Sequence, residues 1–292
     1  MGKMKGILEL MRPGQWMKNL FVLTPLFFSG QMDDTVHLLN ATVAMAVFCM
    51  AASGIYCLND VMDAEADRRH PEKRRRPVAS GRIGKQAAIC WGAVLEILAI
   101  GMAWLAIGEG MAVVLAAYTI LNTAYCLWLK KFALVDVFII AAGFLLRLMA
   151  GSVSTGIRLS HWIVLMTFLL ALFLALAKRR DDVLIHERGE GQMRRNVERY
   201  NLPFIDTAIA ITVAVTLVCY FMYTLSTDVM ERTGSSDLYL TGLFVLLGML
   251  RYLQLTMVDA CSGSPTRLVM KDRFMQLCIA GWMACFTVIL YL

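Results

Sequence analysis

Three carboxylates stand at helical spacing just before a dense run of bases. Asp60, Asp63 and Asp67 are three and four residues apart, and residues 68–85 contain eight Lys and Arg side chains. If the preceding apolar helix continues through them, all three carboxylates project from one side, together with Asn59. Like charges at this spacing destabilise a helix unless a cation neutralises them, and Mg²⁺ prefers such oxygen ligands. The spacing therefore predicts a magnesium site.

The bases that follow indicate what such a metal ion would accompany. Mg²⁺ commonly binds one or two carboxylates together with phosphate oxygens of a substrate, and Arg binds phosphate in bidentate fashion. Pro71, Pro77 and Gly81 break the helix, so the basic stretch can fold back over the acidic face. A membrane anchor or a patch for anionic lipids would explain the bases alone, but not the carboxylates. We therefore predict a site for Mg²⁺ and a diphosphate.

The elements that position these residues are predicted to be membrane helices. Of the 292 residues, 59% are hydrophobic and only 17% are charged, and the mean hydropathy is +0.62. Soluble domains are usually about one quarter charged, whereas apolar runs of about 20 residues are typical of membrane spans. A shorter run, 19–32, brings the expected number of spans to nine. The other eight runs lie near 38–58, 86–107, 111–129, 132–154, 161–177, 204–226, 238–257 and 274–292.

The distribution of Lys and Arg predicts the orientation of these spans. With the N-terminus inside, 24 of the 28 bases fall in inner segments and 2 in outer loops, while Arg147 and Arg251 lie within spans. This is a strong positive-inside pattern. It predicts a multi-pass protein of the cell (inner) membrane, with the N-terminus cytoplasmic and the C-terminus outside. The net charge of +6 then needs no nucleic-acid partner.

The predicted fold class is therefore an all-α polytopic membrane protein. Residues 1–292 form one integral membrane domain, in which about nine transmembrane helices surround a central cavity that opens to the cytoplasmic side. Two long inner loops, about 59–85 and 178–203, supply its polar active-site cap. An oligomer is compatible with this pattern, because the outward face of any membrane helix is apolar.

The acidic motif resembles that of a known family. N-D-x-x-D-x-x-x-D from Asn59 to Asp67, followed by R-P-x-x-x-G from Arg76 to Gly81, is similar to the first signature of the UbiA superfamily of intramembrane prenyltransferases. The resemblance implies nine transmembrane helices, two cytosolic acidic motifs and Mg²⁺-bound diphosphate substrates. The second motif departs from the family pattern: D-x-x-x-D is usual there, whereas this chain has K-R-R-D-D at 178–182. The Lys-Arg start suits phosphate binding better than a second metal ion.

Finer matches resemble one branch of that superfamily. H-P-x-K-x-x-R-P, from His70 to Pro77, is similar to the decaprenyl-phosphate phosphoribosyltransferase branch, whereas aromatic prenyltransferases more often carry R-T-x-x-R-P there. The resemblance extends over nearly the whole chain. The other matching stretches are R-P-G-Q-W-M-K-N at 12–19, residues 130–151, Lys178-Arg179, Arg251-Tyr252, Pro265 and Asp272-Arg273.

The resemblance implies a Mg²⁺-dependent pentosyltransferase. It would move a 5-phosphoribosyl group from 5-phosphoribosyl 1-diphosphate (PRPP) to a polyprenyl phosphate, decaprenyl-like, and release diphosphate, as in the synthesis of a cell wall precursor. The lipid phosphate is already ionised near neutral pH, so no strong general base is required. The barrier lies in charge separation at the anomeric carbon, and catalysis is expected to be electrostatic.

Roles for individual residues follow from this expectation. Asp60, Asp63 and Asp67 are expected to be catalytic, holding Mg²⁺ and the diphosphate, and a ribose hydroxyl is the alternative partner of Asp67. The other candidates are expected to bind substrate. They are Asn59 beside the metal, Lys73 and Arg76 for donor phosphates, Lys178 and Arg179 from the second loop, Lys18 and Asn19 for the lipid phosphate, Lys130 and Asp136 on the same inner side, and Arg147.

Two charged residues inside spans have two interpretations each. Charges within a membrane are costly and usually functional. Arg147 either lines the cavity or forms a buried structural pair, with Glu96 as a candidate partner, and Arg251 has the same two alternatives.

The principal alternative function is true prenyl transfer, in which an isoprenoid moves from its diphosphate to an aromatic acceptor. It would use the same Mg²⁺ site, but the H-P-x-K linker and the missing D-x-x-x-D motif argue against it. A transporter would typically place its polar groups near the bilayer midplane, whereas here they collect at the cytoplasmic face.

Overall fold

The computed structural model describes residues 2–69, 73–187, 199–259 and 265–291, and helices joined by turns make up this part of the chain. No strand occurs within those ranges. Residues 70–72 and 188–198, which belong to the two predicted loops, lie outside the described residues. The chain forms two compact units, Met1–Leu159 and Ser160–Leu292, and the single domain stays a prediction.

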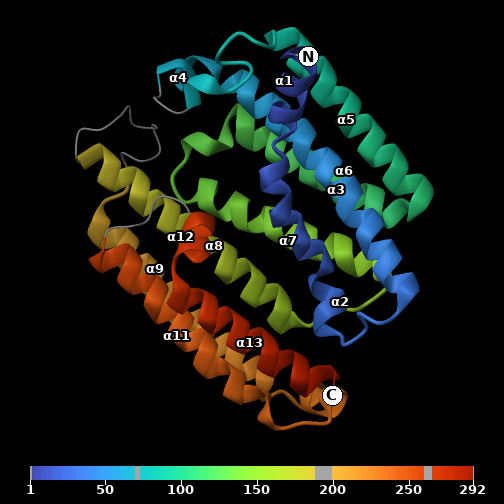
Figure 1. The fold of residues 1–292 in the computed structure, drawn as a ribbon, viewed down its shortest axis with the longest axis vertical. Helices are drawn as coiled ribbons and strands as arrows, with labels where there is room; N and C mark the ends of the chain where they lie inside the picture. The colour runs from blue at the N-terminus through green and yellow to red at the C-terminus, as the bar shows by residue number, and fades with distance from the viewer. Residues whose placement is uncertain (1, 70–72, 188–198, 260–264, 292) are drawn as a thin grey trace. The chain divides into compact units, whose positions relative to one another are not determined.

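Unit 1 is built around α3 (Thr35–Met62), a helix of 28 residues. This helix packs against α1, α5, α6, α7 and the 3₁₀ segment η1 (Figure 1). Asp34 caps its N-terminus by accepting hydrogen bonds from the backbone N–H groups of Val36 and His37, which stabilises the first turn. The other elements of unit 1 are α1 (Gly2–Met11), η1 (Pro13–Leu23), α2 (Thr24–Phe28), α4 (Ala64–Arg69), η2 (Lys73–Arg75), α5 (Lys85–Ala106), α6 (Glu109–Leu127), η3 (Leu129–Lys131) and α7 (Val135–Thr155).

Unit 2 consists of a pair of long helices and a C-terminal group. The long helices α8 (His161–Glu187) and α9 (Leu202–Thr224) pack side by side, and α11 (Gly242–Leu253) packs against α13 (Arg273–Tyr291) (Figure 1). A π-helical turn, η6 (Gln254–Val258), continues α11. The remaining elements are α10 (Thr227–Thr233), η5 (Asp237–Thr241) and α12 (Pro265–Lys271).

Seven helices are long and apolar enough to cross a membrane, and Arg273–Ile289 is a shorter apolar helix within the described residues. They correspond to the eight long runs expected from the sequence. The ninth run, 19–32, is instead divided between η1 and α2. Only residues 19–23 of η1 belong to this run: five 3₁₀ residues rise about 10 Å and the five residues of α2 about 7 Å, which is short of the ~30 Å of a hydrocarbon core. The count of nine stays a prediction.

The second predicted loop begins later than expected. Residues 178–187 continue helix α8 as far as Glu187, and α9 starts at Leu202. Their charges therefore lie on a helix that extends beyond its apolar part. Asn201 caps α9 by accepting a hydrogen bond from the backbone N–H of Phe204, which explains the sharp restart.

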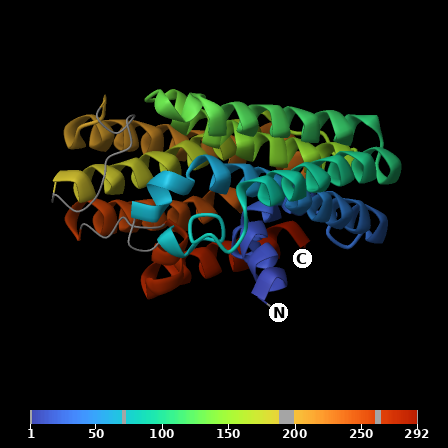
Figure 2. The same cartoon turned by 90° about the horizontal axis from the view of Figure 1, so that it is seen from above.

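Helices α3 and α5 run closely side by side, as two orthogonal views show (Figures 1 and 2). The contact depends on Gly54 and Gly92. A Cβ atom on Gly54 would lie 2.7 Å from Glu96 Oε1 and 2.9 Å from the Gly92 carbonyl oxygen. Small residues allow such close backbone approach between membrane helices, where lipid provides no hydrophobic driving force.

This packing yields a stability prediction. Gly54→Ala forces α3 and α5 apart and should lower the free energy of unfolding by about 1–3 kcal/mol, measured as thermal unfolding in detergent. Gly101→Ala, on α5 with nothing within 4 Å of the added Cβ, is the matched control and should be at least as stable as wild type, because Ala favours the helix. Equal midpoints for the two variants would contradict the packing role.

Candidate functional site

The predicted acidic face lies where α3 ends and α4 begins. Asp63 is the C-terminal cap of α3, and its backbone N–H donates to the Asn59 carbonyl oxygen at 2.9 Å. The Asp67 N–H donates to the Asp63 carbonyl oxygen at 2.8 Å, so the i to i+4 pattern continues through the junction. Asp60 and Asp67 are buried, whereas Asp63 is partly exposed.

Asp60 is the most enclosed of the three carboxylates, with a side chain that is 1% exposed. Its Oδ1 forms an ion pair with Arg12 and lies 3.7 Å from Nη1 of Arg76. Its Oδ2 is buried and has no hydrogen-bond partner among the described residues. A buried carboxylate oxygen without a partner is costly, and it is a ligand of the type that Mg²⁺ prefers.

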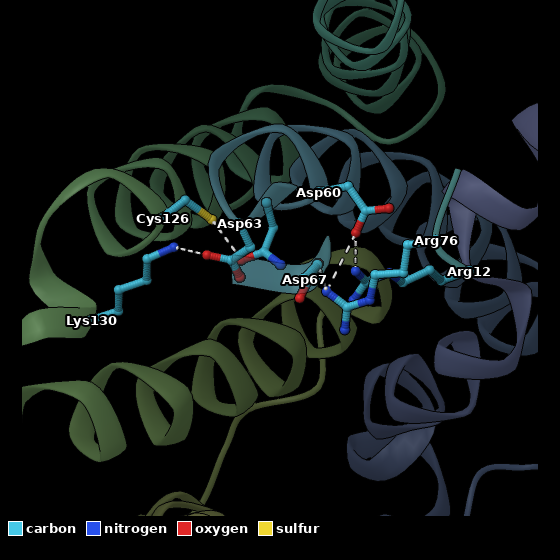
Figure 3. A network of polar contacts seen from close by, with 8 residues as sticks. Arg12, Asp60, Asp63, Asp67, Arg76, Cys126 and Lys130 are labelled. Carbon is cyan, nitrogen blue, oxygen red and sulfur yellow. Dashed lines mark hydrogen bonds and ion pairs between the residues drawn. The ribbon is translucent and has the colours of Figure 1, made fainter. Parts of the chain in front are cut away.

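The other two carboxylates are also paired with bases. Arg76 Nη1 donates to Asp67 Oδ2 at 2.6 Å, and Lys130 Nζ donates to Asp63 Oδ1 at 2.6 Å. In Figure 3, Asp63 is directed towards Lys130, Asp60 towards Arg12 and Arg76, and Asp67 lies between them. In the described part of the chain, no group of three or more His, Cys, Asp or Glu side chains converges as a ready metal cluster. The donors fit Mg²⁺ by type, with bases in contact with all three.

The basic stretch folds back onto the acidic face, as the sequence predicted. Gly81 adopts φ of 78°, a left-handed conformation that favours glycine, and the Ile83 N–H donates to the Pro77 carbonyl oxygen at 3.1 Å. Arg68 Nε closes the turn by donating to the Ala79 carbonyl oxygen at 3.1 Å. This turn brings Arg76 to Asp60 and Asp67.

Arg12 belongs to this site, although the sequence analysis did not include it. It links α1 to η1 in the left-handed conformation with φ of 51°, which is uncommon and strained for a residue other than glycine. Its guanidinium also lies over the Tyr56 ring, 5.2 Å from the centroid. The Arg-Pro pair at 12–13 was the available signal, because a residue before proline is driven out of the helical conformation.

Arg147 lies apart from the carboxylates, buried within α7. It donates to Asn19 Oδ1 at 2.8 Å, to the Gly143 carbonyl oxygen at 2.8 Å and to the Tyr118 hydroxyl at 3.2 Å. The expected alternative of a pair with Glu96 is wrong, since Glu96 Oε2 accepts from Thr119 at 2.7 Å instead.

The remaining candidates of unit 1 surround these two groups. Asn19 is buried, and its Nδ2 donates to Cys49 Sγ at 3.1 Å, while Lys18 is exposed. Asn59 Oδ1 accepts from Cys126 Sγ at 3.7 Å. Lys73 is partly exposed in η2, and Asp136 is buried in the first turn of α7.

Unit 2 contains bases that have acidic partners of their own. Arg179 is buried and pairs with Asp182, and Lys178 is exposed on the same helix. The neighbouring Arg180 donates from Nε to Asp206 Oδ1 at 2.6 Å.

Arg251, whose role the sequence left open, forms a structural pair at the end of α11. Its Nη2 donates to Asp272 Oδ2 at 2.7 Å. The Arg251 guanidinium and the Met275 N–H hold the pKa of Asp272 below its usual range. The pair joins α11 to the start of α13.

Carboxylates and bases at the end of an apolar helix, on an all-helical frame, define an intramembrane protein that handles anionic groups. This chain belongs to the UbiA prenyltransferase family, whose sequence pattern matches residues 20–255. It is therefore a polytopic membrane protein.

Relatives and solved structures agree with this assignment. The decaprenyl-phosphate phosphoribosyltransferase of Mycolicibacterium smegmatis is 32% identical over 296 residues, which cover 98% of this chain and 92% of that protein. The protein of the same name from Mycobacterium tuberculosis is 32% identical, over 96% of this chain and 92% of its own length. A UbiA homologue from Archaeoglobus fulgidus, solved with GPP and Mg²⁺, has the same fold with a TM-score of 0.72 and 16% identity, covering 98% of this chain and 100% of that one.

The pairing of Arg12 with Asp60 generates a second prediction. Arg12→Met leaves a buried carboxylate short of one counter-charge, so without divalent cations the protein should lose up to about 3 kcal/mol of stability. Mg²⁺ should restore more stability to Arg12→Met than it adds to wild type, measured by thermal unfolding in EDTA and in millimolar Mg²⁺.

The matched control for this prediction is Arg82→Met. It removes the same group from an exposed pair with Glu9, 2.6 Å long, and from hydrogen bonds to Ser80 Oγ and the Arg75 carbonyl oxygen, so any change in stability should be independent of Mg²⁺. If Arg12→Met responded to Mg²⁺ no more than Arg82→Met, Asp60 would not be part of a cation site.

Proposed function

We propose that this protein transfers a 5-phosphoribosyl group from PRPP to a polyprenyl phosphate and releases diphosphate. Two arguments support it: the relatives of that name align over nearly the full chain, and the carboxylate group has a buried, unpartnered oxygen on Asp60. The unpartnered oxygen of Asp60 is the main support for the mechanism, because it needs a cation beside it and the diphosphate of the donor binds together with Mg²⁺.

In this mechanism Asp60, Asp63 and Asp67 would hold Mg²⁺ and, through it, the diphosphate of the donor, with Asn59 beside them. Mg²⁺, when bound, supplies positive charge to the departing diphosphate. Arg12 and Arg76 already lie at these carboxylates.

The bases would then exchange partners as the donor binds. Arg12, Arg76 and Lys130 would bind diphosphate oxygens through charge-assisted hydrogen bonds, and the three carboxylates would be available to hold Mg²⁺. Asp67 would either help to hold the metal ion or bind a ribose hydroxyl. Lys73 adds charge from the same turn.

The chemical step requires little from the chain beyond charge and position. An oxygen of the lipid phosphate attacks the anomeric carbon, and the bond from that carbon to the diphosphate oxygen breaks. The electron pair leaves with the diphosphate, whose charge the bases stabilise. Lys18 and Asn19 are proposed to act on a substrate phosphate, which the sequence analysis expected to be that of the lipid, and Asp136 to support Lys130 on the inner side. The substrate-binding roles of Lys178 and Arg179 stay predictions from the sequence.

The experiment combines purified protein, Mg²⁺, PRPP and a polyprenyl phosphate, and detects phosphoribosylated lipid by mass spectrometry. We expect product that disappears in EDTA. Asp63→Ala should lower the rate about a hundredfold or more, as when a key electrostatic group is removed. Glu65→Ala, an exposed carboxylate on the adjacent helix turn, should leave the rate unchanged.

Other outcomes of this experiment would reject the proposal. Activity on a polyprenyl diphosphate with an aromatic acid, and none on PRPP, would establish prenyl transfer instead. Equal rates for Asp63→Ala and Glu65→Ala would remove the carboxylates from the mechanism.

We further propose that the N-terminus and the basic segment at 73–85 face the cytoplasm and that the C-terminus lies outside the inner membrane. The concentration of Lys and Arg in these segments supports this orientation. An epitope tag after Leu292 should be removed by protease added outside intact spheroplasts, whereas a tag before Met1 should be protected. The reverse pattern would invert the topology.

A further inference from the structure

A second concentration of positive charge lies deeper in unit 1, at Arg147. This side chain is 5% exposed, and its three hydrogen bonds go to an amide oxygen, a carbonyl oxygen and a hydroxyl group. None of its partners in the described residues is a carboxylate. A guanidinium has five N–H donors, so two are left to bind something else. A buried cation in a membrane helix without a counter-charge is costly and usually functional.

Aromatic rings account for only part of this arrangement. Phe48, Tyr118 and Phe144 lie with their centroids 5.1 to 5.3 Å from the Arg147 guanidinium carbon. Such cation–π contacts offset some of the cost of burial. They provide no acceptor for the two remaining N–H groups, and they do not neutralise the charge.

Lys18, which precedes Asn19 in η1, adds a second uncompensated charge. Its side chain is exposed, and it forms no hydrogen bond or ion pair with any described residue. The positive charges of Arg147 and of Arg12 both act on the Lys18 ammonium, and like charges repel. At the carboxylate group, by contrast, Arg12, Arg76 and Lys130 are paired with acids. The excess of charge here therefore points to an anionic ligand.

The contacts of Arg147 and the carboxylate group lie at different positions along α3. Asn19 connects Arg147 to Cys49 on α3, and Cys49 precedes Asp60 by eleven residues, about 16 Å along a helix. Lys18 connects the two groups of charge, because both Arg147 and Arg12, the partner of Asp60, act on its ammonium. A phosphate bound at Arg147 would lie about three helix turns from Asp60 along α3.

We propose that Arg147 and Lys18 form a second anion site that binds a phosphate monoester, with Asn19 as the positioning residue that orients the guanidinium. The inference rests on the proposed function for its two possible sources: the 5-phosphate of the ribosyl donor and the phosphate of the lipid acceptor. Both offer the same chemistry, a doubly charged group that accepts several hydrogen bonds.

The first test measures binding without turnover. Wild type, Lys18→Met and the matched control Lys131→Met, another exposed lysine in the same unit, are unfolded thermally in EDTA with inorganic phosphate, ribose 5-phosphate or farnesyl phosphate. Wild type and Lys131→Met should be stabilised, and the Kd for phosphate should rise about tenfold in Lys18→Met, as for one lost charge-assisted hydrogen bond. Stabilisation by ribose 5-phosphate identifies the donor, and stabilisation by farnesyl phosphate identifies the acceptor.

The second test uses the reaction itself. Lys18→Met should raise the KM of the substrate that carries the bound phosphate about tenfold, with the KM of the other substrate and kcat little changed. Arg147→Gln should raise this KM more than Arg147→Lys does. If neither variant folds, the Lys18→Met result is the test of the site.

The outcomes separate this inference from the proposed function. The site is rejected if phosphate does not stabilise wild type, or if Lys18→Met behaves like Lys131→Met in both assays. If phosphate binding depends on Lys18 but no phosphoribosylated lipid forms, the anion site stands and the proposed function fails.

Discussion

A carboxylate that is buried at the end of a membrane helix needs a positive charge beside it, and the structure of unit 1 follows from meeting this need at Asp60. One oxygen of Asp60 is paired with Arg12 and lies near Arg76, and the other has no described partner. Each base comes from a separate segment: the α1–η1 junction and the turn before Gly81. The strained backbone of Arg12 is explained by this requirement, because strain at a residue persists only where its surroundings impose it.

The same constraint depends on how closely the helices pack. Gly54 and Gly92 let α3 and α5 approach each other, while Phe48 and Tyr118 fill the space between α3 and α6, with ring centroids 4.6 Å apart. In lipid, such fitting of surfaces and interhelical hydrogen bonds provide most of the association energy. A rigid α3 then holds Asp60 and the contacts of Arg147 at a fixed separation along one helix.

The charged groups are arranged differently in the two units. Carboxylates with bases around them lie in unit 1, whereas the described bases Arg179 and Arg180 in unit 2 each have an acid, Asp182 and Asp206. The Archaeoglobus homologue keeps the fold at 16% identity, and fold alone does not define the reaction. The argument for phosphoribosyl transfer therefore depends on the site and on the relatives that align over nearly the whole chain.

The sequence by itself determined the class of protein. Apolar runs of span length predicted the long helices. The spacing of Asp60, Asp63 and Asp67 predicted an acidic face at the end of α3, and the basic segment that contains Arg76 was predicted to fold back onto it. Both are local properties, since helix period and chain breakers act over a few residues. Only the tertiary structure decided that Arg12 and Lys130 complete this group, that Glu96 bonds to Thr119, and that Arg147 has no carboxylate partner in the described residues. These pairings join residues up to 128 positions apart, and partner choice over such separations is set by helix packing, which no local pattern encodes.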